Sequence, residues 1–457
     1  MRAVALAALL LAACADAPPA RRAESAPETT RSALCPEAEP PDGGTDVEFD
    51  GVEDWASAKT ARLFDNRVLP RRFRIEVAPE DWEWLKGHAR EEQYVDATVE
   101  HEGERFGGAS VRFKGGYGSL FACFDEDGRQ ICDKLSLKVS FNERTAGGRF
   151  QGVRKLAFNS CNRDKTCLRE RLSYELYRDV GLPASRAVHA LVSVNDGPES
   201  LYLLVEHIDK EWIEDRFAEP EGNLYKEVWP QHLSDEPYRD ALRTNKDAGD
   251  VSRMVELARI LADVTEAGFD EALEPWIDTE AMLRYFVVDQ VIHNWDGIWK
   301  FYCGRWGCGN HNYYVYDDPQ SKRLHILPWD LDHTFNRPNT DMARSWWDVD
   351  DEACEVEVVD SRFRIRAPQC DPLLRGLMLL HWDAWRELLE ELTQGDDAPL
   401  SAAAQLRRLD RYRSMIHTAV EGDPLGPDAR EWRAAVAQLR QVIRAQAVEI
   451  RRFLSGG

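Results

Sequence analysis

The first half of the chain alternates between apolar and polar positions, a pattern typical of strands with one buried face. RRFRIEV (71–77) predicts a strand, and Pro79 begins a short helix after it. Residues 94–116 predict two strands separated by a turn, and KLSLKVSF (134–141) predicts another. The N-terminal part is therefore expected to be mixed, with antiparallel strands.

The strand KLSLKVSF separates its residues into an apolar face and a polar face. The apolar face consists of Leu135, Leu137, Val139 and Phe141. Lys134 and Lys138 share the other face, close in sequence to a glycine-rich turn that begins at Lys114. All three lysines are candidates for binding nucleotide phosphates. The alternative for Lys134 and Lys138 is a solvent-exposed strand face.

A helix is predicted over 166–180, because Gly181 and Pro183 stop its pattern. Its Glu170 and Glu175 can pair with a strand lysine, or belong to an exposed pattern of charges spaced four residues apart. The next two apolar runs, 187–194 and 200–207, predict a hairpin.

From about residue 251 the pattern becomes helical. Residues 276–293 predict a buried helix, and a stripe of apolar side chains from Trp432 to Leu454 predicts a core-facing helix at the C-terminus. The predicted fold class is α+β, with two lobes: a mixed N-terminal lobe with antiparallel strands and a mainly helical C-terminal lobe.

Polar residues interrupt three neighbouring apolar or strand-forming runs. They are HNWD (293–296), NHN (310–312) before YYVY, and the acids of PWDLD (328–332). Asn and Asp also favour turns, so each residue taken singly fits a strand-end turn. The ordered set favours a functional site.

The three runs contain the minimum that phosphoryl transfer needs: one carboxylate to accept a proton, and an Asn and an Asp to hold Mg²⁺. Asp296 is the expected base, and Asn312 and Asp330 are the expected metal ligands, with Asp332 sharing the metal. Histidines 293, 311 and 333 flank these acids. They are interpreted as structural neighbours, and a transition-metal site is the alternative.

Charge and cysteine content narrow the class of protein. The formal charge of −23, from 58 basic and 81 acidic residues, argues against nucleic acid as a partner.

Of ten cysteines, eight fall into close pairs: 123 with 132, 161 with 167, 303 with 308, and 354 with 370. Such pairs indicate disulfides and an oxidising compartment. Zinc is the rival interpretation, but no CxxC spacing supports it.

The N-terminus resembles a bacterial lipoprotein signal over residues 1–14. Arg2 precedes an apolar run that is too short to span a membrane, and LAAC ends at Cys14. We expect a lipid on Cys14 to anchor the chain in the cell envelope, at the outer membrane in a Gram-negative organism. Residues 15–60 are expected to be a disordered tether, because Pro, Ala, Glu, Ser and Thr dominate its first thirty or so positions.

Successive blocks of the sequence resemble the CotH kinase family of atypical protein kinases. They run from about Arg62 to Asn336: LFDNRVLPRRFRIEV, GxxxVRFKGGYGS, KLSLKVSF, FQGVRKLAFNS, LRERLSYELYRDVGLPASRA, LYLLVEHID, GNLYK, HNWD, HNYYVY and PWDLD. The chain departs from the family at residues 114–119, where the family has a longer polar run. The implied CotH kinase-like domain is 61–340, and residues 341–457 would be a disulfide-stapled loop and a helical extension.

The resemblance implies the remaining assignments. The chain would be a kinase that uses ATP with Mg²⁺, or Mn²⁺, and phosphorylates Ser or Thr of an envelope or surface protein. Glu206 and Ile208 would lie along the adenine, mostly through backbone groups. Two alternatives are a non-catalytic kinase-like scaffold or adhesin, and a metal-dependent phosphohydrolase that uses the same acids.

Overall fold

The computed structural model describes residues 60, 62–65, 67, 69–116, 120–247, 249–304, 307–336, 355–357 and 364–456. All of them belong to one compact unit, residues 57–457. The predicted signal with Cys14, nearly all of the predicted tether, the glycine-rich turn beyond Gly116, and Cys354 lie outside the described residues.

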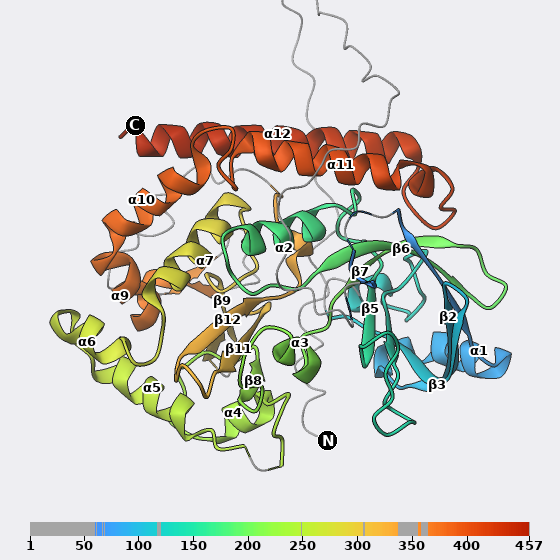
Figure 1. Ribbon diagram of the computed structural model, residues 1–457, viewed down its shortest axis with the longest axis horizontal. Helices are drawn as coiled ribbons and strands as arrows, with labels where there is room; N and C mark the ends of the chain where they lie inside the picture. The colour runs from blue at the N-terminus through green and yellow to red at the C-terminus, as the bar shows by residue number, and fades with distance from the viewer. Residues whose placement is uncertain are drawn as a thin grey trace, which may run out of the picture. The chain divides into compact units, whose positions relative to one another are not determined.

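The alternating segments of the first half close into a barrel (Figure 1). Its strands are β1 (Arg71–Glu76), β2 (Val95–His101), β3 (Glu104–Phe113), β4 (Leu137–Ser140), β5 (Lys155–Asn159), β6 (Ala187–Val194) and β7 (Ser200–Val205). The order is β1-β2-β3-β4-β5-β7-β6, and β6 returns to β1. The predicted antiparallel pairs are confirmed, whereas the pair that closes the barrel, β1 with β6, is parallel. Closure leaves no exposed sheet edge.

Alternation along the strands fills the barrel. Phe73, Ile75, Val99, Val111 and Val139 are at most 2% exposed and belong to one hydrophobic core. Helix α1 (Pro79–Gly87), which begins at the predicted proline, contributes Leu85 to the same core. The barrel therefore has a core of its own.

A second hydrophobic core lies in the rest of the unit. Its helices are α2 (Arg169–Asp179), α3 (Lys210–Glu214), α4 (Glu236–Ala241), α5 (Ser252–Asp263), α6 (Phe269–Leu273), α7 (Thr279–Val291), α9 (Pro372–Leu380), α10 (Trp382–Thr393), α11 (Ala402–Glu421) and α12 (Ala429–Leu454). On α12 the predicted stripe is largely buried: Trp432, Val436, Leu439, Ile443 and Ile450 are at most 3% exposed. The mixed α+β class and the helical C-terminal part are confirmed.

Two small sheets accompany these helices. One has the order β12-β11-β8 and contains β8 (Asn223–Lys226), β11 (Tyr313–Asp317) and β12 (Leu324–Pro328). The other has the order β10-β9-β14-β13 and contains β9 (Phe301–Gly304), β10 (Gly307–Gly309), β13 (Glu355–Glu357) and β14 (Arg364–Arg366). The first sheet carries part of the candidate site at one of its ends.

Three of the predicted disulfides are present: Cys123–Cys132, Cys161–Cys167 and Cys303–Cys308. Cys370 is also disulfide-bonded, while its predicted partner Cys354 is outside the described residues. Because disulfides persist in oxidising compartments, these bridges indicate an extracytoplasmic protein.

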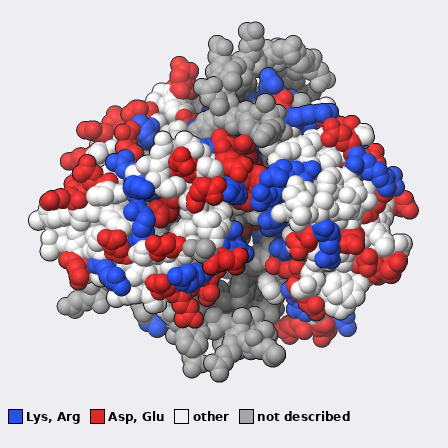
Figure 2. Space-filling view, turned by 60° about the horizontal axis from the view of Figure 1, so that its bottom comes forward, with Lys and Arg blue, Asp and Glu red and all other residues white. Residues whose placement is uncertain are grey.

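The surface reflects the acidic composition. Figure 2 shows Asp and Glu side chains over much of one face, with Lys and Arg side chains bordering a hollow near its middle. Within the described part of the chain, none of the helices has the length and apolarity that a membrane crossing requires.

Candidate functional site

Strand register places Asn312 and Asp330 at the same end of a sheet. β11 and β12 pair antiparallel with Tyr313 opposite Pro328, so the residue before β11 meets the residues after β12. The Trp329 amide donates to the Asn312 carbonyl at 3.0 Å and continues the ladder. Asn312 and Asp330 both have left-handed backbones, with φ of 63° and 55°, a conformation that Asn and Asp tolerate better than most residues.

Asp296 lies in direct contact with Asn312. The Asn312 Nδ2 donates to the Asp296 backbone carbonyl at 2.9 Å and to its Oδ2 at 3.1 Å. Tyr302 donates its hydroxyl to the other carboxylate oxygen at 2.5 Å. Burial and the charge of Asp296 raise the pKa of Tyr302, which keeps the phenol a donor. The predicted base and a predicted metal ligand are therefore brought together.

The side chain of Asn159 links Lys114 to Glu170 of α2. Its Nζ donates to Asn159 Oδ1 at 2.5 Å, and Asn159 Nδ2 donates to Glu170 Oε2 at 2.8 Å. Burial lowers the pKa of Lys114, while the charges of Asp330 and Glu170 oppose that effect. Of the two helix acids considered from the sequence, Glu170 is thus linked to a lysine at the end of β3.

Carboxylates crowd the same region. Burial raises the pKa of Glu170 to about 7, and the charge of Asp330 adds to the effect. Burial also raises the pKa of Asp332 well above its usual range, and repulsion from Asp330 and Glu170 contributes. Asp332 keeps 19% of its side chain exposed. The cluster holds more negative charge than Lys114 alone compensates.

This donor set suits Mg²⁺ better than a metal that needs an all-protein cage. Among the described residues, no group of three or more His, Cys, Asp or Glu side chains is arranged to hold a metal ion. Mg²⁺ in nucleotide sites takes one or two carboxylates and completes its shell with phosphate oxygens and water. Asn312, Asp330 and Asp332 fit that pattern, and the transition-metal alternative gains no support from these residues.

Lys138 belongs to a basic group beside the carboxylates. Its Nζ lies 3.2 Å from His207 Nε2. Burial lowers the pKa of Lys138 to about 6, and the charges of Lys155, Arg112 and Lys114 lower it further. Burial lowers the pKa of His207 well below its usual value. Charge repulsion lowers it further, and it comes from Lys138, Lys155, Lys114 and Lys226.

Lys155 and Lys226 were missed by the sequence argument. Lys155 begins β5, and Lys226 ends β8. Both occur in blocks that resemble the family, FQGVRKLAFNS and GNLYK, and their place in those blocks was the available signal. The charges of four half-buried lysines act together here and suit the binding of an anion: Lys114, Lys138, Lys155 and Lys226.

Lys134 does not join this group. It was predicted to share a strand face with Lys138, but β4 begins only at Leu137. Its Nζ donates to Asp423 Oδ2 at 2.8 Å, to the Leu201 carbonyl at 2.5 Å and to Ser200 Oγ at 3.2 Å. The ammonium group is buried between β7 and the loop that joins the two C-terminal helices. The structure therefore gives Lys134 a structural contact in place of the predicted phosphate contact.

The side chain of Glu206 is likewise committed elsewhere. Arg186 Nη2 and Arg216 Nη2 each lie 2.5 Å from one of its carboxylate oxygens. Burial opposes ionisation, but the two guanidinium groups outweigh it and hold the pKa of Glu206 at about 2. Ile208 is 1% exposed and packs in the second core. Only backbone groups of this segment are left for the predicted adenine contact.

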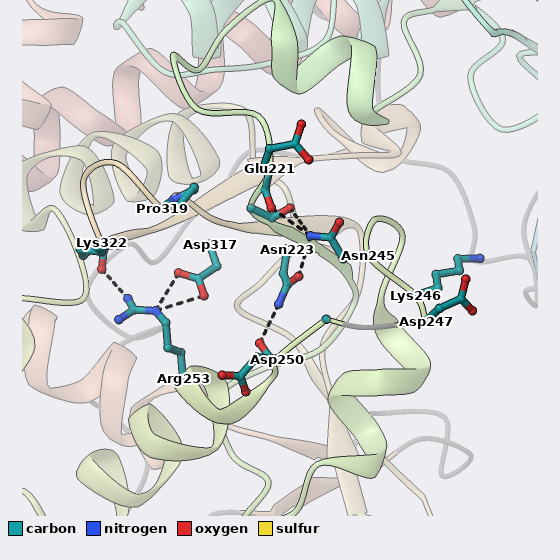
Figure 3. Close-up of a pocket in the computed structure, with 12 residues that line it drawn as sticks. Glu221, Asn223, Asn245, Lys246, Asp247, Asp250, Arg253, Asp317, Pro319 and Lys322 are labelled. Carbon is teal, nitrogen blue, oxygen red and sulfur yellow. Dashed lines mark hydrogen bonds and ion pairs between the residues drawn. The ribbon is translucent and has the colours of Figure 1, made fainter. Parts of the chain in front are cut away.

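A cavity of about 560 Å³ lies at the other end of the β8–β11 pair (Figure 3). Two of its charged side chains pair with each other: Arg253 Nε donates to both Asp317 oxygens at 3.0 and 3.1 Å. Asn245 Nδ2 donates to Asn223 Oδ1 at 3.0 Å. None of the residues predicted for the site lines this cavity.

Comparisons with known proteins identify the family of the chain. The model of the family described as "CotH kinase protein" matches residues 111–450, more than half of the chain. Inner spore coat protein H of Bacillus subtilis (strain 168) is 23% identical over 216 residues, which are 45% of this chain and 55% of that protein. The chain thus spans about half the length of this curated relative.

A solved structure is also similar, that of the Helicobacter pylori proinflammatory kinase CtkA. The similarity covers 70% of this chain and 94% of that chain, with 11% identity and a TM-score of 0.27. A TM-score this low carries no weight for the arrangement of the site.

Proposed function

The chain belongs to the CotH kinase protein family, and from this premise we propose that it transfers the γ-phosphoryl group of ATP to Ser or Thr of an envelope or surface protein. One observation carries the proposal: the contact between Asp296 and Asn312, next to the sheet end that holds Asp330. A proton acceptor and metal ligands at one place are what phosphoryl transfer requires.

In this proposal Asp296 orients the acceptor hydroxyl and accepts its proton. Its carboxylate is fixed by Asn312 and Tyr302, so that little reorganisation is needed when the substrate arrives. General-base assistance of this kind contributes about 10²- to 10⁴-fold to a rate.

Asn312, Asp330 and Asp332 would hold Mg²⁺, which supplies charge neutralisation for the phosphate oxygens when bound. Because Asn312 Nδ2 is used on Asp296, its Oδ1 is the atom left for the metal. Burial raises the pKa of Asp332, and repulsion from Asp330 and Glu170 adds to it; a bound divalent cation would offset both effects.

The lysines would bind the phosphates of the nucleotide. Lys114 is linked to Glu170 through Asn159. Lys138 contacts His207, and the charges of Lys155 and Lys226 also act on His207. A polyphosphate would offset the mutual repulsion of these four ammonium groups. The net charge of −23 does not oppose nucleotide binding, because the positive charge is local.

We further propose that the protein acts outside the cytoplasm and is anchored by a lipid on Cys14. The disulfides support the compartment. The lipid is supported by the short apolar run and the LAAC sequence before the tether.

A single assay separates this function from its alternatives. The full chain is incubated with γ-labelled ATP, Mg²⁺ and candidate envelope proteins. A kinase transfers label to Ser or Thr, a phosphohydrolase releases it as free phosphate with or without acceptor, and a scaffold does neither. Absence of transfer to every acceptor and to the chain itself, together with absence of Mg²⁺-dependent ATP binding, contradicts the proposal.

A further inference from the structure

The C-terminal hairpin, which consists of α11, α12 and the loop 422–428 between them, packs against α2. In Figure 1 the two helices lie side by side and extend from the barrel strands β6 and β7 to α10, with α2 beneath them. α12 has 26 residues, so it is about 39 Å long at 1.5 Å per residue. An element of this length reaches both parts of the unit.

One face of α2 is held by α11. Arg408 Nε lies 3.2 Å from Glu175 Oε1, and Arg408 Nη2 lies 2.5 Å from Asp179 Oδ2. The guanidinium group of Arg171 sits 3.8 Å from the centre of the Tyr412 ring. The three α2 residues are spaced four apart, so they lie along one side of the helix.

α12 also contacts the segment immediately before α2. The indole Nε1 of Trp432 donates to the Thr166 carbonyl at 3.0 Å, and Trp432 is 1% exposed. Lys165 forms an ion pair with Glu431. The start of α2 is therefore fixed by α12 and its body by α11.

Another side of α2 contacts the candidate site. Tyr174 Oη accepts a hydrogen bond from the Asp330 amide at 3.1 Å, and Ser173 Oγ is 2.8 Å from Thr334 Oγ1. Glu170 receives the bond from Asn159, which in turn holds Lys114. At 100° per residue, Glu170 and Ser173 lie about 100° or more around the helix from the residues that meet α11, whereas Tyr174 lies between the two sets, about 60° from Arg171.

The hairpin is itself anchored at both ends. The side chain of Asp423 in its loop is 3% exposed and binds Lys134 Nζ at 2.8 Å, Ser200 Oγ at 2.5 Å and the Leu201 amide at 2.9 Å. On the helical side, Gln446 Nε2 donates to the Gln290 carbonyl at 3.2 Å. An element fixed to β7 and to α7 cannot shift without breaking buried polar contacts.

We propose that the C-terminal hairpin is a built-in brace that holds α2 in register, so that Glu170 and Tyr174 keep Lys114 and Asp330 in place. Arg408 is its principal positioning residue and acts through Glu175 and Asp179. The catalytic part of this inference rests on the proposed function, whereas the mechanical part does not.

Hydrogen exchange tests the mechanical part. Arg408→Gln should raise amide exchange in α2 and in residues 328–335, because it removes both ion pairs to α2. Arg440→Gln is the matched control: it removes the ion pair of Arg440 with Asp410, which joins α12 to α11 without touching α2. Equal exchange in α2 for Arg408→Gln and the parent overturns the brace. If Arg408→Gln does not fold, Asp179→Asn removes one of the two ion pairs and serves in its place.

Kinetics test the catalytic part. Arg408→Gln should lower kcat about 10-fold or more, because a small misplacement of catalytic groups is costly. Arg408→Lys should recover part of the loss, and Arg440→Gln should keep the parent kcat. In a Glu170→Gln background, Arg408→Gln should cost less than about twofold, because coupled residues are not additive. A full additional loss in that background shows general destabilisation and overturns the positioning role.

The exchange and kinetic experiments distinguish failure of the brace from failure of the proposed kinase function. If the parent shows no phosphoryl transfer, the proposed function fails, and the exchange data still decide whether the hairpin holds α2. If the parent is active and Arg408→Gln matches it in both kcat and exchange, the brace fails and the kinase stands.

Discussion

The side-chain amide of Asn312 donates to two oxygens of Asp296, the backbone carbonyl at 2.9 Å and the carboxylate at 3.1 Å. Two residues 16 positions apart are thereby locked together, one after α7 and one before β11. Because the amide nitrogen is used twice, the amide oxygen faces away from Asp296. The contact fixes the carboxylate of Asp296 and leaves the Oδ1 atom of Asn312 to bind a cation.

Removing either proposed metal ligand should weaken Mg²⁺-dependent nucleotide binding. We expect Asn312→Ala and Asp330→Ala each to lower the affinity at least about 10-fold, as loss of groups around a metal commonly does. Calorimetric titration of ATP with Mg²⁺ and with EDTA measures the effect. Asp247→Ala, at the cavity in Figure 3, is the control and should bind like the parent. Parent affinity in both ligand variants would remove the metal site.

Lys134 and Lys138 should respond differently to the same change. Lys138→Met should raise KM for ATP and leave the fold intact, because Lys138 has cationic neighbours and a lowered pKa. Lys134→Met should leave Asp423 buried without its ammonium partner, at a cost of about 3–5 kcal/mol in unfolding free energy. Denaturant unfolding and steady-state kinetics of both variants test this difference. Equal changes in unfolding free energy and in KM for the two variants would contradict it.

The contrast between these lysines marks a limit of the sequence. Alternation along KLSLKVSF predicted β4, but the strand covers only Leu137–Ser140, so Lys134 lies before it. What separates Lys134 from Lys138 is Asp423, 289 positions later in the chain, and local periodicity holds no information about so distant a partner. The ion pairs of Glu206 with Arg186 and Arg216 are also tertiary contacts that a local pattern does not show, while its predicted adenine contact through the backbone stays a prediction.

Local patterns predicted other features well. The strands before residue 141, the hairpin of β6 with β7, and the cysteine pairs 123–132, 161–167 and 303–308 all appear as expected. The parallel pairing of β1 with β6, which closes the barrel, joins strands far apart in sequence, and a local pattern does not specify it. The HNWD, HNYYVY and PWDLD motifs led to the prediction that Asp296, Asn312 and Asp330 form one site. The Asp296–Asn312 hydrogen bonds and the pairing of β11 with β12 bring these segments together, and the roles of the three residues stay predictions.

The ion pairs of Glu206 should make stability depend on pH in acid. Its pKa is about 2 in the folded chain against an ordinary value of 4.5. A depressed carboxyl pKa contributes stability that is fully present above about 4.5 and is lost as pH falls towards 2. This shift corresponds to about 3 kcal/mol. Chemical unfolding between pH 6 and 2.5 should show a smaller loss in Glu206→Gln than in the parent, and equal slopes would contradict the assignment.

The Cys303–Cys308 bridge should affect turnover more than global stability. It joins β9 to β10 across a short loop, and closing a short loop stabilises the chain less than closing a long one in the chain-entropy account. Tyr302, which binds Asp296, is its neighbour in β9. We expect the Cys303→Ser, Cys308→Ser double variant to unfold near the parent midpoint and to turn over more slowly. Peptide mapping of non-reduced protein verifies the bridge, and free thiols at both positions would refute it.

Single-turnover phosphoryl transfer by Asp296→Asn tests the central claim most directly. The substitution keeps the shape of the side chain and removes its ability to accept a proton, so the rate should fall about 10²- to 10⁴-fold. ATP affinity in the presence of Mg²⁺ should stay near that of the parent, because the nucleotide contacts are assigned to the lysines and the metal ligands. A near-parent rate in Asp296→Asn would contradict the account, since Asp296 would then not be the base.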